Sequence, residues 1–148
     1  MDIILIAAIT QDGYIARHSN ETITWSRDLP LFKKQTMGYP VIMGSNTYNS
    51  IQNELKGREI IKFNRNKKPI DILNSLSSSK CFIAGGGITN KYFSPHLSHI
   101  FLTPHPIIFG GGIKLFQGEI EERNLLLENS VIVNKQENII QYQYKIIN

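Results

Sequence analysis

The sequence predicts an α/β fold: a three-layer sandwich whose central, mostly parallel, twisted sheet has helices on both faces and an antiparallel C-terminal hairpin. Three observations favour it. Residues 3–9 form a continuous apolar run rich in β-branched side chains, as in a strand covered on both faces. Short apolar runs then alternate with segments of helical spacing over about two-thirds of the chain. Residues 125–147 alternate apolar and polar side chains around Glu137 and Asn138, as in an antiparallel hairpin.

The remaining elements follow from shorter patterns. Residues 28–36 place Leu29 and Phe32 at helical spacing, and Pro30 is tolerated in a first helical turn. Residues 17–24 are polar and indicate a mobile loop. The other predicted elements are strands at residues 40–43, 59–63, 81–84 and 99–103, and helices after residue 47, at residues 70–76 and at residues 89–93.

Length and composition favour one domain, residues 1–148, because no low-complexity linker divides the 148 residues. The 41% hydrophobic and 19% charged residues are typical of a globular protein. The net charge of +4 can attract polyanions, but the 16 Lys and Arg residues are spread along the chain, which disfavours a nucleic-acid surface. The densest basic run, residues 62–68, is either a solvated loop or a site for a phosphorylated ligand.

Cysteine and histidine content restricts the chemistry. Cys81 is the single cysteine, so an intrachain disulfide is impossible, and its apolar surroundings favour core packing over a nucleophilic role. A reducing, cytoplasmic setting fits this cysteine usage. The four histidines show no metal-ligand spacing, so we expect no metal site. Residues 3–9 lack the features of a signal peptide and are too short to cross a bilayer, so we expect no membrane association.

Three predicted strand-to-helix junctions are rich in small residues: residues 44–47, 64–65 and 85–89. Ligands of doubly wound sheets bind beyond the carboxyl ends of the strands, and small residues let backbone N–H groups approach an anion closely. Each junction alone could be only a tight turn, but three together suggest a dinucleotide along this edge. Asn90 stands where the third glycine of a GxGxxG fingerprint would be, so a plain Rossmann domain is not predicted.

Asp28 is the other candidate for chemistry. It could be an N-terminal carboxylate that caps the predicted helix. Alternatively, it could lie in an apolar pocket beside Leu29 and Phe32 and pair with a ligand that carries adjacent N–H donors. Reactive side chains are otherwise sparse, which suggests that a cofactor supplies the chemistry.

Several motifs in order resemble dihydrofolate reductase: ITQDGYIA, Trp25, DLPLFKKQTMGYPVIMGSNTYNSI, LKGR, FIAGGGITNKYF and FLT, which cover residues 1 to about 103. The resemblance implies the dihydrofolate reductase-like fold and reduction of 7,8-dihydrofolate to 5,6,7,8-tetrahydrofolate by NADPH, a step of one-carbon metabolism. Hydride would reach pterin C6 and a proton N5. The partner would be this small molecule, with a monomer or homodimer as the assembly.

The resemblance also implies site residues. Asp28 would bind the pterin and promote protonation of N5. Thr103 would hydrogen-bond the Asp28 carboxylate. Trp25 would be the third catalytic residue. The substrate would contact Ile6, Ala7, Asp28, Leu29, Phe32, Ile51, Leu55, Thr103 and Arg58, the last gripping its α-carboxylate. The cofactor would contact Ala8, Ile15, Gly44, Ser45, Asn46, Thr47, Asn64, Arg65, Ala84, Gly85, Gly86, Gly87, Ile88 and Thr89. Asn64 and Arg65 would hold the 2′-phosphate, Gly85-Gly86 would be joined by a cis peptide, and residues 13–25 would close over the nicotinamide.

Departures from the family leave alternatives open. Ser45 stands where the family usually has a basic residue that contacts a cofactor phosphate, and Arg65 is a plausible substitute for that contact. Ile88 and Asn90 stand where the family often has basic and aromatic residues. The preference for NADPH over NADH is therefore left open. The segment PHPIIFGGGIKLF resembles the RibD C-terminal reductase superfamily, which reduces a ribosylaminopyrimidine in riboflavin synthesis. A catalytically inactive nucleotide-binding module is a third possibility. Asp28 with Thr103 and Arg58 favours dihydrofolate. We expect residues 110–112 to form only a turn on the rim of the sheet.

Overall fold

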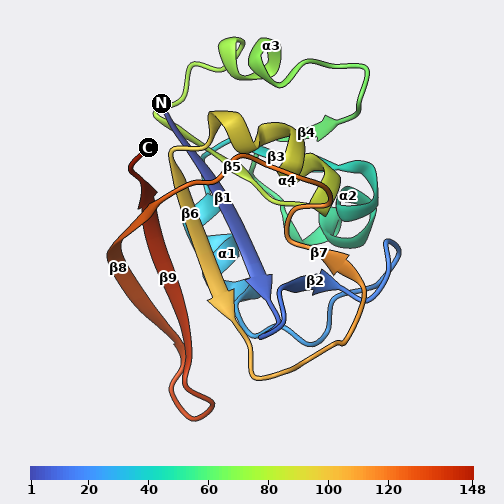
Figure 1. Cartoon of the computed structure of the whole chain (residues 1–148). Coiled ribbons are helices and arrows are strands. Elements are labelled where there is room, and N and C mark those ends of the chain that lie inside the picture. The colour runs from blue at the N-terminus through green and yellow to red at the C-terminus, as the bar shows by residue number, and fades with distance from the viewer.

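The computed structural model describes residues 1–148, except for the side chain of Gln52. Its main sheet has seven strands in the order β4-β3-β5-β1-β6-β9-β8. The bounds are β1 Asp2–Ile9, β3 Val41–Gly44, β4 Ile60–Phe63, β5 Lys80–Ile83, β6 His99–Pro104, β8 Leu125–Asn134 and β9 Ile139–Ile146. Strands β1, β3, β4, β5 and β6 pair in parallel, whereas β9 pairs antiparallel with β6 and β8. This mostly parallel sheet with an antiparallel C-terminal hairpin confirms the predicted fold class (Figure 1).

Helices cover both faces of the sheet. They are α1 Leu29–Thr36, α2 Ser45–Ile51, α3 Pro69–Asn74 and α4 Gly87–Phe93, with the short 3₁₀ helices η1 Gln52–Glu54 and η2 Ser94–His96. Residues of α1 and α2 pack on one core cluster, which contains Ile4, Ile6, Val41, Met43, Leu55 and Phe82. Residues of α3 and α4 pack on the other, which contains Leu5, Ile42, Phe63, Leu73, Cys81, Ile83, Phe93, Leu97 and Ile100. Figure 1 shows α1 and α4 on opposite sides of β1.

The continuous apolar strands predict this arrangement correctly because a strand between two helical layers needs apolar side chains on both faces. In β1, Leu5 contributes to one core cluster and its neighbours Ile4 and Ile6 to the other. Cys81 is fully buried in β5, which is the packing role that its apolar surroundings favour.

A second, two-stranded sheet was not predicted. It pairs β2, Tyr14–Ala16, with β7, Ile113–Lys114, in antiparallel fashion. The glycine-rich residues 110–112 lead into β7 and lie against β2, where a Cβ atom on Gly112 would collide with the carbonyl oxygen of Ala16. These residues therefore stand beside the small sheet rather than on the rim of the large one.

Within the residues that the structure describes, no helix combines the length and apolar character that crossing a bilayer requires. The same residues contain no group of three or more His, Cys, Asp or Glu side chains placed to hold a metal ion.

Candidate active site

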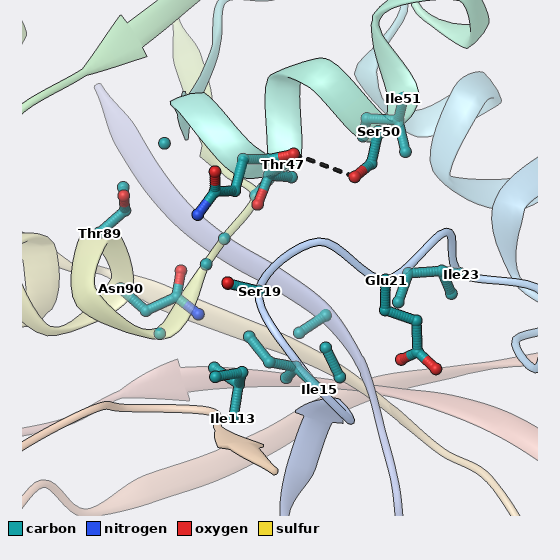
Figure 2. Close-up of a pocket in the computed structure, with 18 of the residues that line it drawn as sticks. Ile15, Ser19, Glu21, Ile23, Thr47, Ser50, Ile51, Thr89, Asn90 and Ile113 are labelled. Atoms are coloured by element: carbon teal, nitrogen blue, oxygen red, sulfur yellow. Dashed lines mark hydrogen bonds between the residues drawn. The ribbon is translucent and has the colours of Figure 1, made fainter.

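A cavity of about 630 Å³ opens beyond the carboxyl ends of β1, β3, β4 and β5. This is the edge at which parallel α/β sheets bind their ligands. Its walls come from separate parts of the chain, as Figure 2 shows: Thr47 and Ser50 lie on α2, Thr89 and Asn90 on α4, and Glu21 and Ile23 on the loop after β2. Ile15 of β2 and Ile113 of β7 close the side opposite α2.

Most of the residues predicted from the sequence line this one cavity. They are Ile6, Ala7, Ala8, Ile15, Trp25, Asp28, Leu29, Phe32, Gly44, Ser45, Asn46, Thr47, Ile51, Asn64, Arg65, Ala84, Gly85, Gly86, Gly87, Ile88 and Thr89. The structure thus brings the predicted substrate and cofactor residues together around a shared space.

Three predicted residues lie outside the cavity. Leu55 is buried in the core cluster under α1 and α2, so its side chain supports the cavity wall without forming it. Thr103 is fully buried in β6 and reaches the cavity only through its neighbour Asp28. Arg58 borders a separate, smaller pocket of about 410 Å³, together with Lys33, Lys34, Met37, Asn53, Glu54 and Lys56.

Asp28 lies at the start of α1 with only 7% of its surface exposed. Its side chain makes no capping hydrogen bond, so the helix-cap interpretation is wrong and the carboxyl group is free to face the cavity. Burial raises the pKa of this carboxyl group, against smaller opposing effects from the nearby His105 ring and from the Thr103 and Ser26 hydroxyls. A carboxyl group with a raised pKa in a cleft is a common mark of a catalytic acid.

Buried polar atoms without a hydrogen-bond partner gather at this cavity. In the described part of the chain they are Trp25 Nε1, Asn90 Oδ1 and Thr103 Oγ1. Trp25 and Asn90 line the cavity, and Thr103 lies beside Asp28. Because an unpaired buried polar atom costs about 1–3 kcal/mol, such atoms are usually found where a ligand or water completes them.

Glycines form the cavity floor. The Gly44 N–H group donates to the Gly85 carbonyl oxygen over 2.9 Å, which joins the ends of β3 and β5. Gly85 has φ +93°, a conformation that favours glycine, and the Gly85-Gly86 peptide is cis, as the resemblance implied. A Cβ atom on Gly44 would lie 2.9 Å from Thr89 Oγ1, so a larger residue there would have to displace that side chain.

The loop after β2 covers the cavity and holds itself in shape. The Arg17 backbone N–H group donates to Glu21 Oε1 over 2.9 Å, and Arg17 Nη1 donates to Glu21 Oε2 over 2.6 Å. The Arg17 guanidinium also lies 4.3 Å from the centre of the Phe109 ring, which attaches the loop to the chain before β7. A polar stretch predicted as a mobile loop therefore contains a bonded turn over the cavity.

Several cavity residues were not predicted: Ala16, His18, Ser19, Glu21, Ile23, Ser26, Ser50, Phe63, Asn90, Ile113 and Gln117. Those between Ala16 and Ser26 belong to the covering loop, whose position could have suggested them. Ile113 and Gln117 reach the cavity because β7 pairs with β2, and no local pattern signals that contact.

The family model described as dihydrofolate reductase matches residues 2–138. The chain belongs to the dihydrofolate reductase family. Membership in this family supports an oxidoreductase activity, of the folate-reducing type.

Two named relatives agree with this family. Dihydrofolate reductase type 3 of Salmonella typhimurium is 31% identical over 117 residues, which span 70% of this chain and 71% of that protein. Dihydrofolate reductase HdrB of Haloferax volcanii is 41% identical over 56 residues, which span 36% of this chain and 28% of that protein. The aligned part of the second relative is thus much shorter than the protein itself.

A solved structure shows the same fold. The "Putative riboflavin biosynthesis protein" of Shewanella sp. PV-4 superposes with a TM-score of 0.73 over 100% of both chains, at 19% sequence identity. At that identity the likeness concerns the fold alone.

Proposed function

We propose that the chain is an NADPH-dependent dihydrofolate reductase that produces tetrahydrofolate. The observation that carries this proposal is the buried Asp28 carboxyl group, which has the Thr103 hydroxyl as its neighbour and lines the same cavity as the unpartnered Trp25 Nε1 atom. A buried acid and an unused N–H donor in one cavity suit a heterocycle that carries both hydrogen-bond donors and acceptors.

The cavity around Asp28 suits a flat, partly apolar ring. Leu29 and Phe32 extend from the same helix, and Ile6 and Ile51 face them from β1 and α2. Apolar walls exclude water and strengthen the few polar contacts inside. We assign to Asp28 the adjacent N–H donors of the pterin ring, which a carboxylate can accept in pairs.

The remaining half of the cavity fits a phosphorylated dinucleotide. Gly44 and Gly85 line the cavity and carry no side chains, so a ligand can approach the backbone of this wall closely. Arg65 lines the same space and supplies the positive charge that a phosphate requires. Asn90 donates from Nδ2 to the Leu115 carbonyl oxygen over 2.9 Å, which leaves its buried Oδ1 atom to accept from a ligand.

The chemistry divides between ligand and protein. Bound NADPH supplies the hydride that pterin C6 receives. Asp28 orients the ring, and its raised pKa keeps more of the carboxyl group protonated than an exposed aspartate would, which favours proton delivery towards N5. The loop that contains Arg17 and Glu21 keeps bulk water away from the reacting atoms.

A riboflavin-pathway reductase is the competing function, and its substrate carries a phosphate group. Apart from Arg65, the ionisable side chains on the cavity wall are His18, Glu21 and Asp28. The Asp28 carboxyl group at the proposed ring site disfavours a phosphate group there, because like charges repel, whereas the Glu21 carboxylate is already paired with Arg17.

The test is NADPH consumption by the purified chain with dihydrofolate or with the deaminated riboflavin precursor as substrate. We expect turnover with dihydrofolate. If a folded protein consumes NADPH only with the riboflavin precursor, or with neither compound, the proposed function is wrong.

A matched pair of variants tests the role of Asp28. Asp28→Asn should lower the rate of hydride transfer at least about 100-fold near neutral pH, because an essential acid is lost. Asp71→Asn, in the exposed first turn of α3, should leave the rate unchanged. Equal rates for the two variants would show that the Asp28 carboxyl group takes no part in the reaction.

A further inference from the structure

His105 follows the last residue of β6 and is only 1% exposed, and no chemical role was predicted for it from the sequence. Its ring packs edge-on against Trp25, with 5.2 Å between ring centres and planes at 87°. His105 therefore lies behind the cavity wall, in contact with one of the three residues expected to be catalytic.

The two ring nitrogens of His105 have different partners. Nδ1 lies 2.8 Å from the carbonyl oxygen of Thr103, and the backbone N–H group of Arg27 points to Nε2 over 2.9 Å. A carbonyl oxygen can only accept and a backbone N–H group can only donate. Both bonds form together only when Nδ1 carries the proton and Nε2 carries none, so they fix one neutral tautomer.

His105 is itself held firmly by the sheet. Its N–H group donates to the Ile9 carbonyl oxygen over 2.7 Å, and its carbonyl oxygen accepts from Ile107 over 2.8 Å. The Gln11 side-chain amide donates to the same oxygen over 3.2 Å. The backbone of His105 is thus hydrogen-bonded to the end of β1 and follows the end of β6, two central strands of the sheet.

The backbone N–H group of Arg27 links the His105 ring to Asp28, which follows Arg27 in the chain. The Arg27 side chain extends to the surface, where Nε lies 3.5 Å from Glu137, so its link to the site is through its backbone. The position of the Asp28 backbone determines where its side chain begins, and the Thr103 and Ser26 hydroxyls lie beside its carboxyl group. The bond between the Arg27 N–H group and His105 Nε2 fixes that backbone.

We propose that His105 is a positioning residue that holds the Asp28 carboxyl group in the cavity through its bond to the Arg27 N–H group. This inference rests on the proposed function, in which Asp28 is the acid. The simpler possibility is that His105 only fills space behind Trp25, and the two differ in which ring nitrogen matters.

His105→Gln and His105→Asn separate the two bonds. A glutamine oxygen can take the place of Nε2 and accept from Arg27, whereas the shorter asparagine amide can replace Nδ1 and donate to Thr103. Both changes remove the ring from Trp25. We expect His105→Asn to slow hydride transfer about 100-fold, as small displacements of catalytic groups do, and His105→Gln to slow it less than about tenfold.

A double variant shows whether His105 acts through Asp28. In the Asp28→Asn background, His105→Asn should cause no further loss of rate, although it should still lower the stability against urea. Equal losses in the two single variants, or a full additional loss in the double variant, would reduce His105 to a packing residue.

A second readout does not depend on turnover. Both variants lose the effect of the His105 ring on the Asp28 pKa, so the two are compared with each other by carbon NMR: the Asp28 pKa should be lower in His105→Asn than in His105→Gln, because a loosened backbone admits water. Equal Asp28 titrations in the two variants would overturn the inference. If the wild type did not reduce dihydrofolate, the proposed function would fail while this titration still decided the role of His105.

Discussion

Arg58 Nε donates a hydrogen bond to the Oγ1 atom of Thr36, with 2.9 Å between the two atoms. Arg58 Nη1 donates to the Lys56 carbonyl oxygen over 2.6 Å, and Nη2 donates to that of Lys33. A guanidinium has five N–H groups, so one remains free of these bonds on each terminal nitrogen. Arg58 is thus fixed beside the smaller pocket and still able to bind a carboxylate, although it does not line the large cavity.

We predict that Arg58→Ala raises KM for dihydrofolate about 10–100-fold and leaves kcat nearly unchanged. The α-carboxylate would be bound equally in the ground and transition states, and charge-assisted hydrogen bonds contribute about 1.5–3 kcal/mol. Steady-state kinetics measures this split. Thr36→Val removes the partner of Nε and the hydroxyl's own bond to the Phe32 carbonyl oxygen but keeps the guanidinium, so it should raise KM less. A loss confined to kcat in either variant would contradict the assignment.

The pH dependence of stability tests the burial of Asp28. Burial raises the Asp28 pKa in the folded protein above that in the unfolded chain. The stability from this group is therefore complete below the unfolded pKa and is lost as the pH rises through the folded pKa. Asp28→Asn removes that loss, so the variant should resist urea better than the wild type at neutral pH.

This advantage should shrink as the pH falls towards the ordinary aspartate range, where Asp28 is protonated in both states. Urea unfolding over a pH series measures the difference. Asp71→Asn, on the exposed surface of α3, should show no such gain. A variant that is less stable than the wild type at neutral pH would mean that the Asp28 carboxylate stabilises the fold.

Local apolar patterns predict the strands of the large sheet and miss those of the small one. Buried parallel strands such as β1 are continuous apolar runs, which a local pattern reveals. The β2–β7 pair is too short for any pattern, and Asp12 helps to hold the two segments together. Its carboxylate accepts from the Phe109 and Gly110 N–H groups over 3.1 and 2.8 Å. Such contacts between distant residues leave no periodic trace in the chain.

The candidate site divides in the same way. Gly44 at the end of β3 and Asp28 at the start of α1 belong to contiguous motifs and could be predicted. His105 could not, because its importance comes from a bond to Arg27, which is distant in sequence and close only in the fold. Arg58 was predicted through a motif, but its placement beside a second pocket depends on how α1 packs near it.

Arg65 should determine the preference for the phosphorylated cofactor. It lines the cavity, whereas Ser45 offers no charge at the position where the family usually has a basic residue. We predict that Arg65→Gln weakens NADPH binding about 10–100-fold and leaves NADH binding unchanged, since only the 2′-phosphate contact is lost. Quenching of the single tryptophan, Trp25, which lines the same cavity, measures both affinities. Equal weakening of the two cofactors would place the 2′-phosphate elsewhere.

Cys81 should be chemically inert in the folded protein. It is fully buried, and burial raises the pKa of its thiol to about 11, so the reactive thiolate is scarce at neutral pH. A thiol reagent should label Cys81 only as fast as the protein unfolds, and added urea should accelerate labelling. Rapid labelling of native protein would show that β5 opens locally.

The two glycine triplets should respond differently to alanine. A Cβ atom on Gly87 would lie 2.5 Å from the Lys114 carbonyl oxygen and 3.0 Å from Gln117 Cβ, so α4 and the segment after β7 would have to separate. Gly111 has no atom within 4 Å of a Cβ position. We predict that Gly87→Ala costs about 1–3 kcal/mol of stability and weakens NADPH binding, as overpacking does, whereas Gly111→Ala changes stability by less than about 0.5 kcal/mol.

Urea unfolding and cofactor titration of both variants measure these effects. Gly111 is the matched control, because it stands in an equally glycine-rich stretch and differs in lacking a close neighbour. If both substitutions were tolerated, the segment after β7 would not press on the start of α4. If both abolished cofactor binding, the Gly110–Gly112 stretch would also belong to the cofactor site, because its open surroundings give no steric reason for a loss.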